Sequence, residues 1–277
     1  MEYPKIVLHS FAEIPGKVET AEKLILSAIN AGVQTVGFSY PARTSFSLSG
    51  NPTEEEISSF RREITALSKR YFEKIKVLLG ETRDFYADPV FQPCDYIIGS
   101  VHFLVADDGA VCPLGISAER IRADVKAHFG GSVYQMIRRY FETVALLVKR
   151  THCNYVADFD YLQTFNQNRR LFDSDSPEYR SAALDAMEAL ICEKVAFEIG
   201  IREKEDSGQL RFSPSPDIVH WLAAHGAKFY LSANGARESI SPARFLDCTA
   251  YAKSCGAGGF SYLKKGDWKT IFPNGKS

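Results

Sequence analysis

The sequence predicts an α/β fold in which parallel strands, each followed by a helix, form a closed or nearly closed barrel. Short β-rich runs alternate with longer amphipathic stretches along almost the whole chain. Most of the short runs are rich in Val, Ile, Leu, Phe and Tyr without strict polar alternation, which is typical of strands covered on both faces. About seven or eight strand–helix units fit a barrel better than an open sheet.

Each element is predicted from its local pattern. The expected strands are Lys5–His9, Thr35–Ser39, Lys76–Glu81, Tyr96–Phe103, Tyr155–Leu162, Ala196–Ile201, Lys228–Ala233 and Gly259–Leu263. The expected helices are Val18–Ala31, a helix that Thr53 and Glu56 begin with a capping box and that runs to about Lys74, Ala118–Ala127, Ser132–Lys149, Pro177–Lys194, Ser215–Ala224 and Pro242–Ser254. The breaks between units are short and none resembles a linker, so residues 1–277 are predicted to form one domain.

Composition excludes several classes of protein. Apolar residues make up 45% and charged residues 24% of the 277 residues, as in an ordinary globular protein. The net charge of −1 gives no electrostatic argument for binding nucleic acid or an anionic membrane. No apolar run approaches the roughly 20 residues that span a bilayer, and the first residues do not form a signal peptide. With six scattered cysteines and no CxxC pair, we expect reduced thiols and a cytoplasmic protein, of unpredicted oligomeric state.

In such a barrel, functional side chains gather at the carboxyl ends of the strands. The residues expected there are His9, Tyr40, Pro41, Glu81, His102, Asp158, Asp160, Glu198 and Asn234. Any one of these histidines or carboxylates can be an ordinary hydrogen-bonded structural residue. Their coincidence on successive strands favours a divalent metal such as zinc or manganese, which can generate hydroxide near neutral pH.

Seven segments carry a resemblance to a known family. They occur in the order IVLHSF, VGFSYPA, LLGET, DYIIGSVHFL, VADFDYLQTF, AFEIGI and YLSANG. In order, spacing and flanking pattern the chain resembles the PHP-domain family, particularly its histidinol-phosphatase branch, which acts in histidine biosynthesis. The most specific segment is Asp95–Leu104, similar to the family's strand that ends in Ser-Val-His. The resemblance spans nearly the whole chain and implies a distorted (β/α)7 TIM-like barrel that holds about three metals.

The resemblance implies a reduced metal centre. His9, Glu81 and His102 match the family's ligands, and Asp158 stands where the family has a histidine. Five other ligand positions are lost, at Val7, Tyr40, Pro41, Ala233 and Gly235. Val, Pro, Ala and Gly side chains offer no lone pair, and a tyrosine must ionise to be a good ligand. We therefore expect at most one or two metals, with one zinc, manganese or iron ion held by His9, Glu81, His102 and Asp158, rather than a full trinuclear cluster.

The substrate side is altered as well. Family members often carry an arginine after their Gly-His-x-Asp motif to hold phosphate, and Gln163 occupies that place here. Arg43 and Arg202 lie in loops that can face the barrel mouth and are the candidates for binding substrate, although ordinary solvated surface charge is the favoured interpretation of such arginines.

Three hypotheses follow. In the first, the chain is a histidinol-phosphatase-like phosphomonoesterase that binds a small phosphorylated molecule. Glu81, His102 and Asp158 hold the metal, while His9 binds it or transfers a proton. In the second, the chain is a catalytically inactive pseudoenzyme that keeps the barrel as a binding or interaction module. In the third, Asp158, Asp160 and Glu198 act as acid and base without a metal.

Overall fold

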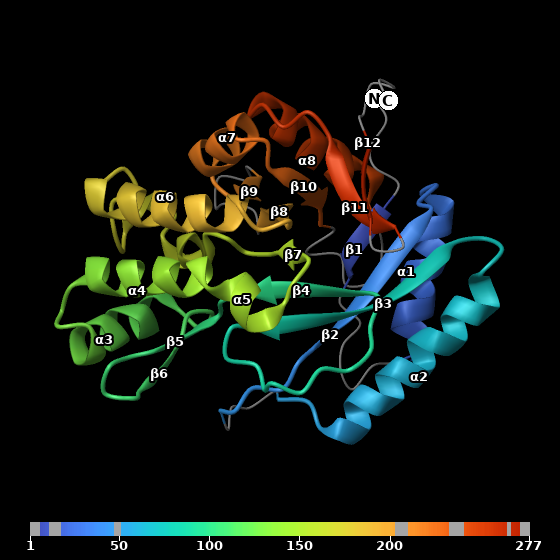
Figure 1. The fold of residues 1–277 in the computed structure, drawn as a ribbon, viewed down its shortest axis with the longest axis horizontal. Coiled ribbons are helices and arrows are strands. Elements are labelled where there is room, and N and C mark those ends of the chain that lie inside the picture. Colours follow the sequence, from blue (N-terminus) through green and yellow to red (C-terminus); the bar gives the residue numbers. More distant parts are fainter. Residues whose placement is uncertain are drawn as a thin grey trace.

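The computed structural model describes residues 6–10, 18–46, 51–202, 210–232, 241–264 and 267–271. Seven parallel strands form one curled sheet: β1 (Ile6–Ser10), β2 (Thr35–Pro41), β3 (Lys76–Asp84), β4 (Tyr96–Ser100), β7 (Tyr155–Val156), β8 (Ala196–Arg202) and β10 (Lys228–Leu231). Within these residues β1 and β10 approach each other but share no hydrogen-bonded ladder. The sheet is therefore a half-barrel of the TIM-like type, and the predicted parallel α/β barrel class is confirmed (Figure 1).

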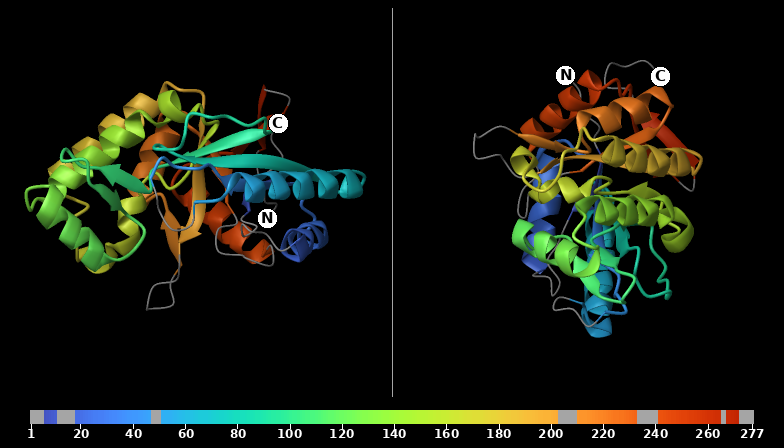
Figure 2. Two further views of the ribbon diagram at one scale, coloured as in Figure 1. Left: turned by 90° about the horizontal axis from the view of Figure 1, so that it is seen from below. Right: turned by 90° about the vertical axis from the view of Figure 1, so that its left-hand side faces the viewer.

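Helices surround this sheet (Figures 1 and 2). They are α1 (Val18–Asn30), α2 (Glu54–Tyr71), α4 (Val133–Ala145), α5 (Leu147–Thr151), α6 (Pro177–Ile191), α7 (Pro216–Ala224) and α8 (Pro242–Ser254). The predicted capping box at the start of α2 is confirmed. The backbone N–H of Glu56 donates to Thr53 Oγ1 at 3.2 Å, and the backbone N–H of Thr53 donates to the Glu56 carboxylate at 2.7 Å.

An additional unit is inserted after β4. It consists of an antiparallel hairpin, β5 (Phe103–Val105) and β6 (Val111–Pro113), followed by helix α3 (Ala118–His128). The arrowheads of β3 and β4 point toward the side on which this unit lies (Figure 1). We call the carboxyl ends of the parallel strands the barrel mouth. The hairpin and α3 lie on the same side of the sheet, beyond these strand ends (Figure 1).

Two predicted strands differ from the structure. The last one, β11 (Phe260–Lys264), pairs antiparallel with β12 (Asp267–Ile271) in a separate two-stranded sheet. Trp268 Nε1 donates to the Lys194 carbonyl at 2.9 Å, so this hairpin packs beside the amino end of β8 instead of extending the barrel. The strand predicted at Tyr155–Leu162 ends at Val156 and gives way to the 3-10 helices η1 (Tyr161–Phe165) and η2 (Gln167–Arg169).

Alternating side chains divide the apolar core into two parts. The outer part lies between the sheet and the helices, and includes Val7, Val36 and Val77. The inner part fills the barrel with Leu8, Leu78, Tyr96, Ile98, Tyr155, Ala157, Ala196 and Tyr230. An ideal Cβ at Gly80 would lie 2.3 Å from the Tyr96 ring, and one at Gly37 would lie 2.3 Å from the Tyr96 hydroxyl. These glycines leave room for the tyrosine at the centre of the barrel.

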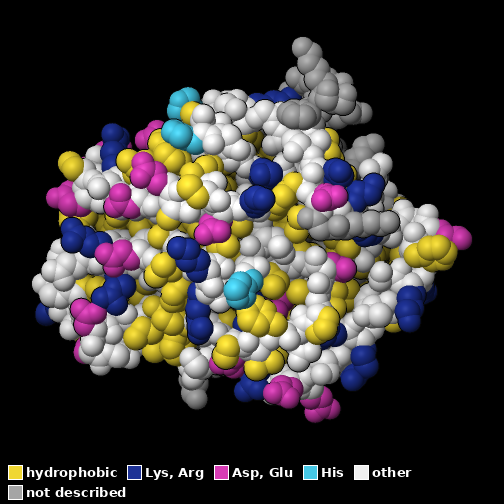
Figure 3. Space-filling view, in the orientation of Figure 1, with side chains coloured by type: hydrophobic (Ala, Val, Ile, Leu, Met, Phe, Trp, Pro, Cys, Tyr) yellow, Lys and Arg dark blue, Asp and Glu magenta, His cyan; other side chains and the backbone are white. Residues whose placement is uncertain are grey.

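The surface matches the balanced composition. On the face in Figure 3, basic and acidic side chains are interspersed without a large area of one sign. Among the described helices, none combines the length and the apolar character that crossing a membrane requires. All six cysteines are free thiols.

The packing around Tyr96 predicts that Gly80→Ala lowers the free energy of unfolding by about 1–3 kcal/mol, because the ring is fully buried and can move only by straining its neighbours. Urea unfolding followed by circular dichroism measures this. Gly258→Ala is the matched control, since nothing lies within 4 Å of a Cβ there and its φ is ordinary. Equal loss of stability in both variants would contradict the assigned role of Gly80.

Candidate functional site

His102 lies at the barrel mouth, two residues after the end of β4. Its backbone N–H donates to Asp84 Oδ2 at 2.6 Å. Its Nε2 lies 3.2 Å from Asp158 Oδ2, and its Nδ1 lies 3.3 Å from Ser100 Oγ. Because β3, β4 and β7 are neighbours in the sheet, their carboxyl ends bring two carboxylates to opposite sides of one histidine.

Glu198 on β8 adds a third carboxylate. The backbone N–H of Asp158 donates to Glu198 Oε2 at 3.3 Å. In register with Glu198 on β10 stands Tyr230, whose buried hydroxyl has no hydrogen-bond partner among the described residues. Four successive strands therefore contribute to one cluster, which we call the mouth group: Asp84, His102, Asp158 and Glu198.

A left-handed turn places Asp158 in the mouth group. Its φ is 53°, a conformation that aspartate tolerates better than most residues. The hydroxyl of Tyr140, on α4, donates to the carbonyls of Asp158 at 2.9 Å and Phe159 at 3.2 Å, and accepts from the backbone N–H of Tyr161 at 3.1 Å. The Tyr161 ring then contacts the His102 imidazole edge-on, with centroids 4.6 Å apart.

The charged groups of the mouth group shift one another's pKa values. Burial alone would lower the pKa of His102, but the hydrogen bond and charge of Asp158, with the charges of Asp84 and Glu198, raise it. Burial also raises the pKa of Asp84, partly opposed by His102. Imidazole and carboxylate donors of this kind are the chemical type that zinc, manganese and iron ions prefer.

Glu81, predicted as a metal ligand, is not brought into the mouth group. Its Oε1 accepts from Arg83 Nη1 at 3.0 Å on the opposite, helix-facing side of β3. Tyr40 lies on the same side of the sheet, where its hydroxyl accepts from Arg61 at 2.9 Å. Strand β3 continues three residues beyond its predicted end at Glu81. Because successive side chains of a strand point to opposite faces, Asp84 faces the mouth, where Glu81 was expected.

Other predicted residues have different placements. His9 belongs to β1, but its side chain lies outside the described part of the structure, as do residues Ala233, Asn234 and Gly235. Val7 is buried in the outer core, and Pro41 ends β2.

Asp160 and Arg202 form a buried pair beside the mouth group. Arg202 Nη2 lies 2.5 Å from Asp160 Oδ1 and 2.8 Å from Ser213 Oγ. The other Asp160 oxygen accepts from the backbone N–H of Ser215 at 2.8 Å. These contacts tie β8 to β9 (Arg211–Ser213) and to the start of α7. They occupy Arg202, which had been expected to bind substrate.

Gln163 and Arg43, also expected at the substrate, lie elsewhere. Gln163 Oε1 accepts from Asn166 at 3.1 Å within the η1 turn. Arg43 is 3.4 Å from Glu54 and lines a small cavity together with Tyr40 and Glu81. Sequence inspection missed Asp84, although the repeat Leu78-Gly80-Thr82-Asp84 on one face of β3 is a signal that points to it.

The mouth group offers suitable metal donors, but it is not compact. His102 Nε2 and Asp158 Oδ2, 3.2 Å apart, are spaced as two donors on one ion would be. Within the described residues, however, three donor atoms come within 4.8 Å of one another only at Cys112, Asp124 and His128, outside the mouth. Among the described atoms, the mouth group therefore does not bring three donors this close together.

Two solved structures share this fold. One, from Listeria monocytogenes and described as a histidinol phosphatase, has 15% identity and a TM-score of 0.69, covering 83% of this chain and 94% of its own. The other is histidinol phosphate phosphatase from Lactococcus lactis, in complex with zinc, L-histidinol and phosphate. It has 17% identity and a TM-score of 0.65, covering 96% of this chain and 98% of its own. Neither a protein-family model nor a curated protein matches the sequence. These likenesses confirm the predicted fold.

The placement of Arg202 predicts that Arg202→Met lowers the free energy of unfolding by roughly 3–5 kcal/mol, because it leaves the buried Asp160 carboxylate without its counter-charge. Arg43→Met removes the exposed ion pair with Glu54 and should change the free energy of unfolding by less than about 1 kcal/mol. Denaturant unfolding of both variants measures the difference. A stable Arg202→Met protein would instead favour a substrate-binding role for this arginine.

The environment of His102 predicts a pH effect in metal-free protein. Its folded-state pKa lies above the unfolded value of about 6.5. Its contribution to stability is therefore fully present below that pH and is lost as the pH rises through the folded-state pKa. Asp158→Asn should lower the pKa of His102, which NMR titration of the imidazole measures after treatment with chelator. Asp108→Asn, a distant carboxylate, serves as control. An unchanged His102 titration in Asp158→Asn would refute this coupling.

Proposed function

We propose that this chain is a histidinol-phosphatase-like phosphoester hydrolase that works with a reduced metal centre at the barrel mouth. The observation that carries the proposal is the convergence of His102 with three carboxylates from successive strands. A fold shared with an enzyme that binds zinc, L-histidinol and phosphate supports it. The substrate would be a small phosphorylated molecule of the same class.

The donors fit one divalent ion of the zinc, manganese or iron type. His102 Nε2 and Asp158 would hold it, with Glu198 beside them, since imidazole and carboxylate donors in an acidic setting suit these ions. When bound, such an ion polarises a phosphoryl oxygen and lowers the pKa of a coordinated water. His9 on β1 is a further candidate ligand or proton-transfer group.

The surrounding residues would orient these donors. Asp84 accepts a hydrogen bond from the backbone N–H of His102 and so fixes the position of the His102 backbone. Tyr140 holds the turn that presents Asp158, and Tyr161 packs against the imidazole edge and restricts its rotation. Partners of this kind stabilise the geometry of a metal site without touching the ion.

A second candidate function is a catalytically inactive barrel that binds a ligand or partner. Two observations favour it: Val7 and Tyr40 face the helix-covered side of the sheet, away from the mouth, and Arg202 is held by Asp160. This alternative predicts neither metal at the mouth nor turnover.

The deciding experiment measures hydrolysis of histidinol phosphate and of an aryl phosphate by purified protein with added zinc, manganese or iron. We expect metal-dependent turnover that Asp158→Asn abolishes. Asp84→Asn, which loses a partner that orients the ligand, should reduce kcat/KM by about 10- to 100-fold. Glu81→Gln is the matched control on the opposite face of the same strand, and should retain activity.

Two outcomes would overturn this assignment. Loss of activity in Glu81→Gln but not in Asp84→Asn or Asp158→Asn would place the chemistry on the outer face of β3. Absence of turnover with every metal, in protein that remains folded, would favour the inactive binding module.

A further inference from the structure

We propose that Cys112, Asp124 and His128 form a second metal site, separate from the barrel mouth and suited to zinc. One donor atom from each residue lies within 4.8 Å of the other two. Cys112 is on β6, and Asp124 and His128 are one turn apart on α3. Residues at this helical spacing lie on one face, and that face packs on the hairpin.

The three donors differ in chemistry. A thiolate, an imidazole nitrogen and a carboxylate oxygen together suit a borderline ion such as zinc better than magnesium or calcium, which prefer oxygen alone. Three protein ligands leave one position of a tetrahedral zinc ion open. The inserted hairpin and α3 would then be joined by the ion as well as by their apolar contacts.

Two neighbouring residues already orient the donors. Asp108, in the turn between β5 and β6, lies 2.7 Å from His128 Nδ1. A histidine that ligates a metal through one ring nitrogen commonly donates a hydrogen bond from the other ring nitrogen to a carboxylate. Arg120 Nε lies 2.9 Å from both oxygens of Asp124, and ligating carboxylates are also usually hydrogen-bonded.

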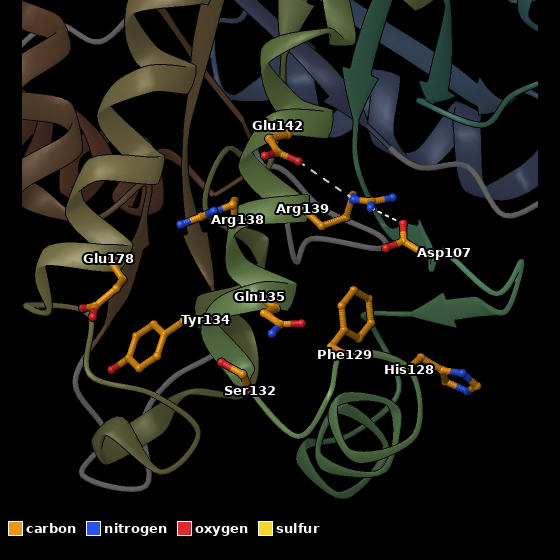
Figure 4. Close-up of a pocket in the computed structure, with 10 residues that line it drawn as sticks. All are labelled: Asp107, His128, Phe129, Ser132, Tyr134, Gln135, Arg138, Arg139, Glu142 and Glu178. Atoms are coloured by element: carbon orange, nitrogen blue, oxygen red, sulfur yellow. Dashed lines mark hydrogen bonds and ion pairs between the residues drawn. The ribbon is translucent and has the colours of Figure 1, made fainter.

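Two of the three donors are buried and the third is partly exposed to solvent. Cys112 is fully buried and Asp124 nearly so, whereas the His128 side chain is about a quarter exposed. His128 also lines a cavity of about 580 Å³ between α3 and α4 (Figure 4). Since the side chain of His128 is partly exposed, an ion can reach this ligand from solvent, and a proposed metal site requires such access.

Cobalt titration of the full-length protein tests the site without relying on enzymatic activity. The mouth group holds only nitrogen and oxygen donors, so a thiolate-to-cobalt charge-transfer band in the near ultraviolet reports a cysteine ligand. Chelator-treated, reduced protein titrated with Co²⁺ should develop this band, and zinc should abolish it. Asp158→Asn, which alters the mouth group, should leave it unchanged, so this result is separable from that for the proposed function.

Variants identify the ligands. Cys112→Ser and His128→Asn should each lose the band, while Cys153→Ser, another buried thiol, should keep it. Asp108→Asn should weaken cobalt binding by about 10- to 100-fold. Because His128 is partly exposed, its variant stays informative if Cys112→Ser fails to fold. The proposal is overturned if wild-type protein shows no thiolate band, or if folded His128→Asn keeps it undiminished.

Discussion

The mouth of this barrel depends on how His102 is held between carboxylates from the two neighbouring strands. Asp84, at the end of β3, accepts a hydrogen bond from the backbone N–H of His102. Asp158, after β7, lies next to Nε2 of the His102 imidazole. Both contacts require the parallel order β3-β4-β7, which brings three strand ends together. The hydrogen bond with Asp158 and the charges of Asp158, Asp84 and Glu198 raise the pKa of His102 against the opposing effect of burial.

Carboxylates of similar sequence context have different roles because of their surroundings. Asp160 lies two residues from Asp158, yet it is neutralised by Arg202 and holds β9 and α7 in place. Glu81 lies three residues from Asp84, yet it faces the helices and pairs with Arg83. Asp84 and Asp158 instead lie beside His102 in the mouth group. Strand direction and tertiary contacts thus decide which carboxylates belong to the mouth group.

Much of the fold could be predicted from sequence because it depends on local patterns. The helices, the capping box at Thr53 and most strands follow from apolar spacing and turn residues. The site was harder to predict, since it depends on strand length and direction. Ending β3 at Glu81 instead of Asp84 changed which carboxylate was expected at the mouth. The turn at Asp158 and the Arg202–Asp160 pair arise from tertiary contacts that no spacing in the sequence shows.

The central claim is that one metal binds beside His102 and Asp158 at the barrel mouth. The most direct measurement is anomalous X-ray scattering at the zinc edge from crystals of zinc-loaded protein. The account predicts a peak between His102 Nε2 and the Asp158 carboxylate, which disappears in Asp158→Asn. A mouth without an anomalous peak, or a peak beside Glu81 on the outer face of β3, would contradict it.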